Sequence, residues 1–243
     1  MSAEVRRVAV VTGAGRGLGG AIAVSLAGRG FDVVVHCNRS REGAEDVGER
    51  IRERGCRAVV VQGDLTNGEG VELLRSVVEQ QFGSVDVLVN NAGVYLGRHG
   101  LELSESEWRE GLDTTVTQTF LTTRALLPML RRSGRGRVIN IGDSGADRPG
   151  ARDLAWSYHI GKTGVWILTR SLATEEASHG VAVNMVSPGF LENSVGSPGQ
   201  QAIPAGRKGS FDDVTGAVEF LASEASGYVT GSNIVVGGGW NLR

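Results

Sequence analysis

Several residue types that characterise other classes of protein are scarce in this 243-residue chain. Two cysteines, Cys37 and Cys56, are too few for a disulfide framework or a metal site, so we interpret both as reduced residues. The longest apolar runs, such as 59–61, are far too short to cross a bilayer, and no signal-peptide pattern opens the chain. A net charge of −2 gives no reason to expect a nucleic-acid partner. These absences favour a cytoplasmic protein with no membrane partner.

Lysine is also rare, because only Lys162 and Lys208 among the 25 basic residues are not arginine. Lys162 follows Tyr158 by four positions, a spacing that places both side chains on one face of a helix. A neighbouring ammonium is expected to lower the pKa of a phenol and to make it a proton donor near neutral pH. We therefore take Tyr158 and Lys162 as a candidate catalytic pair, with an exposed helix pair as the alternative.

Glycine is abundant, with 37 residues in no fixed period, which indicates many tight turns. Short β-branched runs alternate with helical patterns. We expect strands at 7–12, 32–37, 58–62, 85–90, 137–141, 181–186 and 233–236. We expect helices at 18–29, 41–54, 68–81, 105–131, 157–179 and 212–223. Several of these strands are apolar on both faces, as in a parallel sheet covered by helices on each side. The pattern therefore predicts one α/β domain over residues 1–243. We expect a doubly wound parallel sheet of the Rossmann type, with about seven strands and helices on both faces.

Residues 190–209 form the least regular segment, with Ser, Gly and Pro and little apolar period. The segment follows a predicted strand, at the edge where sheets of this kind bind ligands. We interpret it as a substrate lid, with an ordinary surface loop as the alternative.

A glycine-rich turn, Thr12–Gly19, joins the first predicted strand to a helix, as in dinucleotide-binding proteins. The second strand runs into Asn38, Arg39 and Ser40, without the acid that binds the ribose hydroxyl of NAD. Arg39, Ser40 and Arg16 of the turn are suited to a 2′-phosphate instead. These residues favour NADP(H) as the cofactor, although solvated arginines would give the same pattern.

Six motifs together resemble those of the classical short-chain dehydrogenase/reductase family, and the resemblance covers nearly the whole chain. They are Thr12–Gly19, Gly63–Leu65, Asn90–Gly93, Tyr158–Lys162, Ser187–Gly189 and Gly237–Trp240. The resemblance implies that Asp64 faces the adenine and that the backbone of Leu191 meets the nicotinamide carboxamide. With the residues named above, the expected cofactor site comprises Gly13, Arg16, Gly17, Leu18, Gly19, Asn38, Arg39, Ser40, Asp64, Leu65, Asn90, Ala92, Gly93, Tyr158, Lys162, Pro188, Gly189 and Leu191.

The resemblance also implies the chemistry, a direct hydride transfer between nicotinamide and a carbonyl carbon. Tyr158 would protonate the developing alkoxide, and Lys162 would hold the nicotinamide ribose and keep the tyrosine pKa low.

The chain departs from the family where a serine usually bonds the substrate carbonyl, because alignment places Asp143 there and Ser144 next to it. In one interpretation Asp143 enters the site, either protonated and donating to the carbonyl or charged and polarising Tyr158. In a second, a longer segment before Tyr158 lets Ser144 take the serine role. In a third, neither residue acts. Family members that reduce C=N bonds, notably the pteridine reductases, carry an aspartate at this position.

A second departure is Thr115, which occupies the place of an asparagine that supports a proton-relaying water in the family. Its hydroxyl could hold a water less firmly than an amide, or it could have no role. His159 is expected to face away from Tyr158, whereas Tyr95 and His99 are candidates to line the substrate cleft.

The sequence therefore predicts an NADPH-dependent reductase of a ketone on an apolar, cyclic or aromatic substrate, possibly a biosynthetic polyketide. The alternatives are reduction of a C=N bond in a pteridine or cyclic imine, and an NADP-binding protein without catalysis. The family resemblance implies a homotetramer or homodimer built partly on the long helices.

Overall fold

Seven parallel strands form the centre of the protein in the computed structural model, which describes residues 6–148, 150–194, 199–240 and 242. Their order across the sheet is β3-β2-β1-β4-β5-β6-β7, and every pairing is parallel. The strands are β1 (Val8–Val11), β2 (Asp32–Cys37), β3 (Ala58–Gln62), β4 (Val87–Asn90), β5 (Arg137–Ile141), β6 (Ala182–Pro188) and β7 (Asn233–Val236). The predicted fold class is confirmed.

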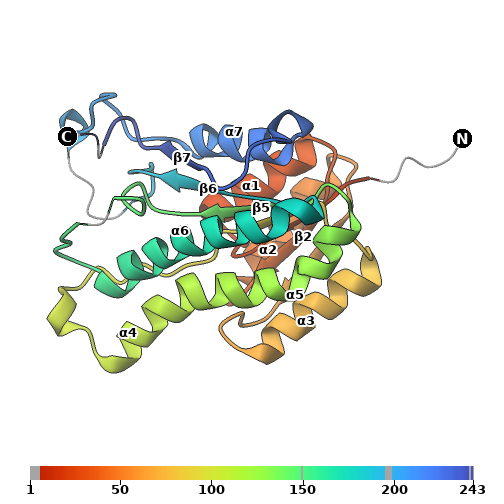
Figure 1. Ribbon diagram of the computed structural model, residues 1–243, viewed down its shortest axis with the longest axis horizontal. Helices are drawn as coiled ribbons and strands as arrows, with labels where there is room; N and C mark the ends of the chain where they lie inside the picture. Colours follow the sequence, from red (N-terminus) through yellow and green to blue (C-terminus); the bar gives the residue numbers. More distant parts are fainter. Residues whose placement is uncertain (1–5, 149, 195–198, 241, 243) are drawn as a thin grey trace, which may run out of the picture.

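Helices cover both faces of this sheet, as Figure 1 shows. Successive strand residues point to opposite faces, so Val10 and Val34 pack in one apolar core while Val11 and Val35 pack in the other. One face carries α1 (Gly17–Gly28), α2 (Arg41–Arg52) and α7 (Phe211–Ala222). The other carries α3 (Gly68–Gln81), α5 (Gln118–Arg132) and α6 (Trp156–Glu176). Strands that are apolar on both sides are thus buried on both sides.

The strand order reverses between β1 and β4, and their carboxyl ends meet there at one edge. In open parallel sheets this reversal leaves a crevice outside the carboxyl ends, where ligands bind. Thr12 follows β1 and Asn91 follows β4, and Asn91 N donates to Thr12 Oγ1 over 3.0 Å. The topology therefore brings the motifs Thr12–Gly19 and Asn90–Gly93 together.

The helix predicted over 105–131 is interrupted in the structure. It consists of α4 (Glu105–Leu112), a π-helical turn η2 (Asp113–Thr117) and α5. Thr114 Oγ1 donates to Glu110 O over 2.6 Å, and Thr115 Oγ1 donates to Gly111 O over 2.6 Å. Threonine hydroxyls that bond backward in this way compete with the backbone ladder and bend a helix. The predicted helical stretch is confirmed, and these threonine bonds accompany the π-helical turn within it.

Helix α6 approaches α4 and η2 unusually closely through glycine. A Cβ on Gly161 would overlap the Thr115 hydroxyl and lie 2.9 Å from Thr115 Cβ. A Cβ on Gly111 would lie 2.7 Å from Ser157 Cβ. These two contacts set the position of α6, which carries Tyr158 and Lys162. The helix begins at Trp156, and its last predicted residues, Ala177–His179, form a separate 3-10 turn, η3.

None of the helices in the described ranges combines the length and apolarity needed to cross a membrane. Within the same ranges, no three His, Cys, Asp or Glu side chains gather as metal ligands would.

Candidate active site

A glycine cradle lies at the carboxyl end of β1. Gly13 has a φ of 63°, and a Cβ there would stand 2.9 Å from Ala92 Cα. A Cβ on Gly19 would overlap Asn91 and the Gly13 carbonyl. Helix α1 begins at Gly17, and its N-cap residue, Arg16, makes no side-chain cap bond. The free N–H groups and the space kept by glycine fit a dinucleotide pyrophosphate.

Thr12 and Asn91 hold this cradle in place. The Thr12 hydroxyl accepts from the N–H groups of Asn91 and Ala92 over 3.0 and 3.1 Å. The Asn91 amide donates to Thr12 O and Gly13 O over 2.9 and 3.2 Å. The predicted site did not include the Asn91 side chain, which the close approach of β1 and β4 brings to the turn.

Asn90, which the predicted site did include, directs its side chain elsewhere. Its amide donates to Thr123 Oγ1 and Asn140 Oδ1, each over 2.9 Å, inside the core. Asn140 continues this network to Thr169 Oγ1. The Asn90 side chain therefore ties β4 to β5, which leaves only its backbone available to a cofactor.

His36 was not among the predicted site residues, although a histidine inside an apolar strand is a signal. Its Nδ1 accepts from Gly13 N over 3.3 Å, and its Nε2 lies 3.0 Å from Gly63 O. Because the carbonyl can only accept, Nε2 carries the proton. Burial lowers the pKa of His36, which keeps the ring neutral. The ring joins the glycine-rich turn to the turn that carries Asp64.

The residues proposed for the 2′-phosphate lie beside that ring. Arg39 is largely exposed, 4.0 Å from Glu110, and the exposed Arg16 lies in the glycine-rich turn. A Cβ on Gly15 would stand 3.1 Å from Ser40 Cβ, so the turn and the end of β2 are in contact. The structure therefore brings both arginine-bearing segments to one corner.

The turn after β3 combines a polar residue at the edge with an apolar anchor. Asp64 Oδ1 accepts from Thr66 N and Thr66 Oγ1 over 2.9 and 2.7 Å. Leu65 is buried in the core below α3. Asn38, opposite, accepts from Gln62 Nε2 through its carbonyl over 3.0 Å.

The segment after β6 lies at the other end of the crevice. A Cβ on Gly189 would stand 2.8 Å from Gly237 Cα. The Leu191 N–H donates to Ser194 Oγ over 2.9 Å, so it must exchange this bond to meet a carboxamide. Gly209 N donates to Phe190 O over 2.9 Å and joins the ends of the predicted lid. Residues 195–198 of that segment lie outside the described residues.

Tyr158 and Lys162 lie together, with Lys162 Nζ 5.6 Å from the centre of the tyrosine ring. The ammonium donates to Ile141 O over 2.6 Å, and burial lowers the pKa of Lys162 to about 8. The pKa of Tyr158 is raised far above its usual value, first by burial, then by the charge of Asp143 and by Tyr95. The predicted lowering of the tyrosine pKa is therefore wrong for the protein without its cofactor, because burial outweighs the ammonium.

Asp143 lies close enough to Tyr158 for its charge to act on the phenol. Asp143 Oδ1 accepts from Gly145 N over 2.9 Å and lies 3.8 Å from His159 Nδ1. The rings of Tyr158 and His159 meet edge to face with centroids 5.4 Å apart. His159 thus faces the site, contrary to the prediction. Tyr95 packs edge to face on Tyr158 at 5.2 Å and forms the outer wall.

Ser144 is buried on the opposite side of the same loop. Its N–H donates to Pro188 O over 3.0 Å. With Arg148, Val235, Gly237 and Trp240, it lines a cavity of about 110 Å³ beside β7. Asp143 and Ser144, adjacent in sequence, thus contribute to two different surroundings.

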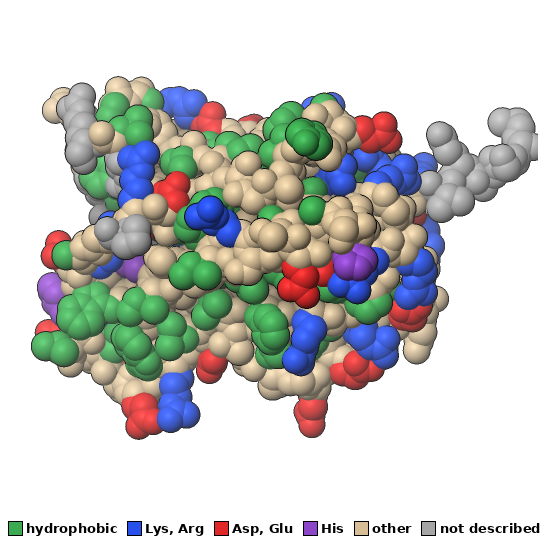
Figure 2. Space-filling view, in the orientation of Figure 1, with side chains coloured by type: hydrophobic (Ala, Val, Ile, Leu, Met, Phe, Trp, Pro, Cys, Tyr) green, Lys and Arg blue, Asp and Glu red, His purple; other side chains and the backbone are tan. Residues whose placement is uncertain are grey.

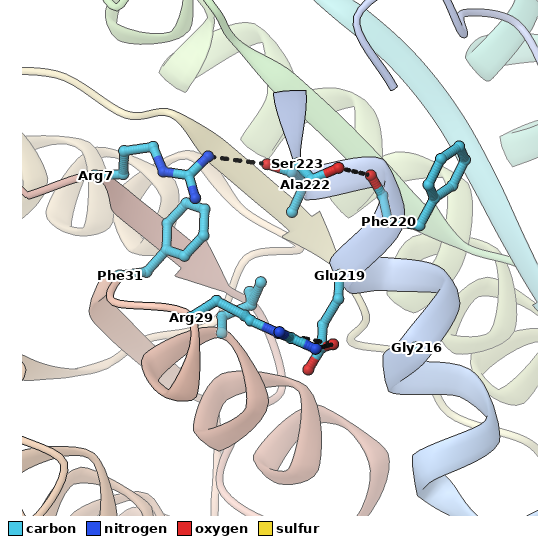
Figure 3. Close-up of a pocket in the computed structure, with 9 residues that line it drawn as sticks. Arg7, Arg29, Phe31, Gly216, Glu219, Phe220, Ala222 and Ser223 are labelled. Atoms are coloured by element: carbon cyan, nitrogen blue, oxygen red, sulfur yellow. Dashed lines mark hydrogen bonds and ion pairs between the residues drawn. The ribbon is translucent and has the colours of Figure 1, made fainter. Parts of the chain in front are cut away.

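A larger hollow of about 410 Å³ lies at the amino edge of the sheet (Figure 3). Arg7 and Phe31, which precede β1 and β2, line it, and Arg29 pairs with Glu219 over 2.6 Å across it. We assign it no part in the chemistry, because the glycine cradle and Tyr158 lie at the carboxyl edge.

Comparisons with known proteins identify the family of this chain. Residues 7–201 match the family described as short chain dehydrogenase. A 3-oxoacyl-[acyl-carrier-protein] reductase from Synechocystis is 38% identical over 98% of both chains, and one from Vibrio cholerae is 35% identical over 96% of both. Acetoin dehydrogenase from Salmonella typhimurium superimposes with a TM-score of 0.89 at 31% identity, covering 98% of this chain and 97% of its own. This chain therefore belongs to the short-chain dehydrogenase/reductase family of nicotinamide-dependent oxidoreductases.

Proposed function

We propose that the protein reduces a carbonyl group with NADPH at the carboxyl edge of its sheet. The observation that carries the proposal is the pairing of half-buried Tyr158 with buried Lys162, whose ammonium lies beside Gly93 at the carboxyl edge of the sheet. The ketone-reducing activity named for its relatives from Synechocystis and Vibrio cholerae supports the same reaction class.

In this mechanism a bound reduced nicotinamide supplies the hydride. Tyr158 gives its phenolic proton to the oxygen of the substrate, which matches a group whose pKa is high enough to keep the proton until an alkoxide forms. Lys162, anchored by Ile141 O, holds the nicotinamide ribose. Tyr95 and His159 pack edge to face against the Tyr158 ring and fix its position.

NADP(H) is the preferred cofactor in this proposal. Arg39 and Arg16 lie on neighbouring segments of the chain. The ion pair of Arg39 with partly exposed Glu110, at 4.0 Å, would be replaced when a phosphate binds. Guanidinium groups bind phosphate through charge-assisted hydrogen bonds, whereas a bare ribose hydroxyl offers them little.

The proposed substrate is an apolar, cyclic or aromatic ketone, possibly a polyketide. Half-exposed Tyr95 and the edge-to-face pair of Phe190 and Trp240, with centroids 5.0 Å apart, offer flat apolar surfaces to such a molecule.

Asp143 supports a second candidate function, the reduction of a C=N bond in a pteridine or cyclic imine. Its charge acts on Tyr158, where a carboxylate would repel the bare oxygen of a ketone but attract the N–H of a protonated imine. For ketone reduction, Asp143 must instead be protonated, or Ser144 must turn toward the substrate.

Turnover of NADPH with matched panels of ketones and imines tests these functions. Tyr158→Phe should lower the rate of reduction by a factor of about 10² to 10⁴ and leave NADPH binding intact. Near-unchanged turnover in this variant would refute the mechanism. If NADPH binds tightly but neither the ketones nor the imines oxidise it, the result would favour the alternative of an NADP-binding protein without catalysis.

Asp143→Ser and Ser144→Ala separate the interpretations of the unusual loop. If Asp143 recognises an imine, Asp143→Ser should lose imine reduction and retain or gain ketone reduction. If Ser144 serves a ketone, only Ser144→Ala should lose activity.

We also propose a homodimer or homotetramer built partly on the long helices. Phe120 of α5 and Ile160 and Ile167 of α6 are exposed by 43, 51 and 62%. Figure 2 shows hydrophobic side chains gathered on the face over the long helices. Analytical ultracentrifugation of Ile167→Glu against the natural protein tests this interface. Residues 190–209 as a lid and a cytoplasmic location stay predictions.

A further inference from the structure

The inner side of the active site offers no route for protons at Thr115. The hydroxyl of this residue donates to Gly111 O over 2.6 Å, and its carbonyl accepts from Thr119 Oγ1 over 2.8 Å. Thr115 is fully buried, and Gly161 packs so closely that no methyl group would fit between them. A gap too small for a methyl group does not hold a water. Thr115 therefore takes no part in a water relay and serves as a packing residue.

The outer side of Tyr158 carries a different pair of proton-exchanging groups. Asp143 Oδ1 and His159 Nδ1 lie 3.8 Å apart, within reach of a small side-chain rotation or one bridging water. Their side chains are 24% and 20% exposed, whereas Lys162 is almost fully buried. This pair therefore lies beside the Tyr158 ring and is partly open to solvent.

We propose that His159 and Asp143 deliver the proton that restores Tyr158 after each turnover. The inference rests on the proposed carbonyl reduction. Asp143 exchanges a proton with the phenol, while His159 acts through Asp143 and positions and supplies that proton.

The protons and electrons of this sequence balance. Hydride adds to the carbonyl carbon, the π electrons move to the oxygen, and the oxygen takes the proton of Tyr158. The substrate is reduced, the nicotinamide is oxidised, and a phenolate remains. The His159 imidazolium gives a proton to the Asp143 carboxylate, the carboxyl so formed gives that proton to the phenolate, and His159 takes a new proton from solvent. One solvent proton enters per turnover, and each group returns to its starting state.

The surroundings of His159 suit a group that gains and loses protons. Burial and the charge of Arg152 lower its pKa, while the charge of Asp143 raises it. Tyr95 and Tyr158 are the other titratable groups against its ring. Burial is the largest of these effects, so the pKa of His159 lies below its usual value and the ring gives up its proton more readily than a free imidazole.

Comparison of single-turnover and steady-state rates tests the relay, because the first turnover uses the proton already on Tyr158. In His159→Asn, the first turnover of NADPH-loaded enzyme should keep the natural rate, while steady-state kcat falls at least about tenfold. Free imidazole should restore kcat. His179→Asn, the same change beyond the other end of α6, should alter neither rate. An unchanged kcat in His159→Asn, or an equal fall of both rates, would overturn the relay.

A second measurement needs no substrate. NMR titration of isotopically labelled histidines in the NADPH complex, assigned with His159→Asn, gives the His159 pKa directly. Asp143→Asn should lower that pKa, because it removes the carboxylate that stabilises the imidazolium. An unchanged pKa refutes the pairing whatever the substrate. An enzyme that turns over but ignores His159→Asn keeps its proposed function and loses only the relay.

Discussion

Gly161→Ala is the sharpest test of how this active site is built. The added methyl group would overlap the Thr115 hydroxyl and stand 2.9 Å from Thr115 Cβ, directly before Lys162. Both partners belong to helices, and Thr115 is held by two carbonyls of its own helix over 2.6 and 3.1 Å. The methyl group therefore has to push α6 away from η2, and Tyr158 and Lys162 move with α6.

The size of the effect follows from opposing terms. Overpacking of a dense interior costs about 1–3 kcal/mol. Loss of a Thr115 hydrogen bond adds about 1 kcal/mol. Alanine recovers about 1 kcal/mol relative to glycine in a helix. The net destabilisation is about 1–3 kcal/mol, which lowers the Tm of a chain of this size by roughly 2–4 °C for each kcal/mol.

A double-mutant cycle separates this contact from a general effect on the helix. In a Thr115→Ala background, Gly161→Ala should cost less than in the natural chain, because the overlap with the hydroxyl is gone and only the 2.9 Å approach to the Cβ at position 115 remains. Gly216→Ala in α7 is the control, because nothing lies within 4 Å of its added Cβ. It should stabilise by about 0.5–1 kcal/mol. Calorimetry measures all four variants, and equal effects of Gly161→Ala in both backgrounds would refute the close packing of α6 on η2.

Three further predictions concern the cofactor and its pH dependence. The pKa of Lys162 is lowered to about 8, so its charge is lost as pH rises through that value. The reduction rate should then fall above about pH 8, and a flat alkaline limb would contradict this. The pKa of His36 is lowered by burial, so its contribution to stability is lost as pH falls below the unfolded value of about 6.5. His36→Phe should flatten this acid loss in thermal unfolding and weaken NADPH binding in calorimetry, because Gly13 N loses its acceptor. Arg39→Ala should reduce the preference for NADPH over NADH about tenfold in binding titrations, since charged hydrogen bonds contribute about 1.5–3 kcal/mol, and an unchanged preference would remove Arg39 from the 2′-phosphate site.

The glycine-rich turn and the start of α1 were predictable because their determinants are local. The turn needs a positive φ at Gly13 and an open helix start at Gly17. Both require glycine at a fixed spacing, and the amino-acid sequence shows that spacing directly. The strands were predictable for a similar reason, since burial on both faces of a parallel sheet needs continuous apolar runs. Asn91 and His36 were missed because their partners lie on other strands.

The chemistry at the substrate end depends on contacts that join distant segments. Spacing placed Lys162 one turn after Tyr158, and local reasoning then expected a lower phenol pKa. Burial between β5, α6 and the Tyr95 loop reverses that expectation, because desolvation depends on everything packed around the group. The roles of Thr115 and His159 likewise depend on how α6 meets η2 and the Asp143 loop. Periodicity and glycine spacing thus determined the sheet and its glycine cradle. The three-dimensional packing decided which side chains face Tyr158, because the environment of a side chain is a property of the assembled fold.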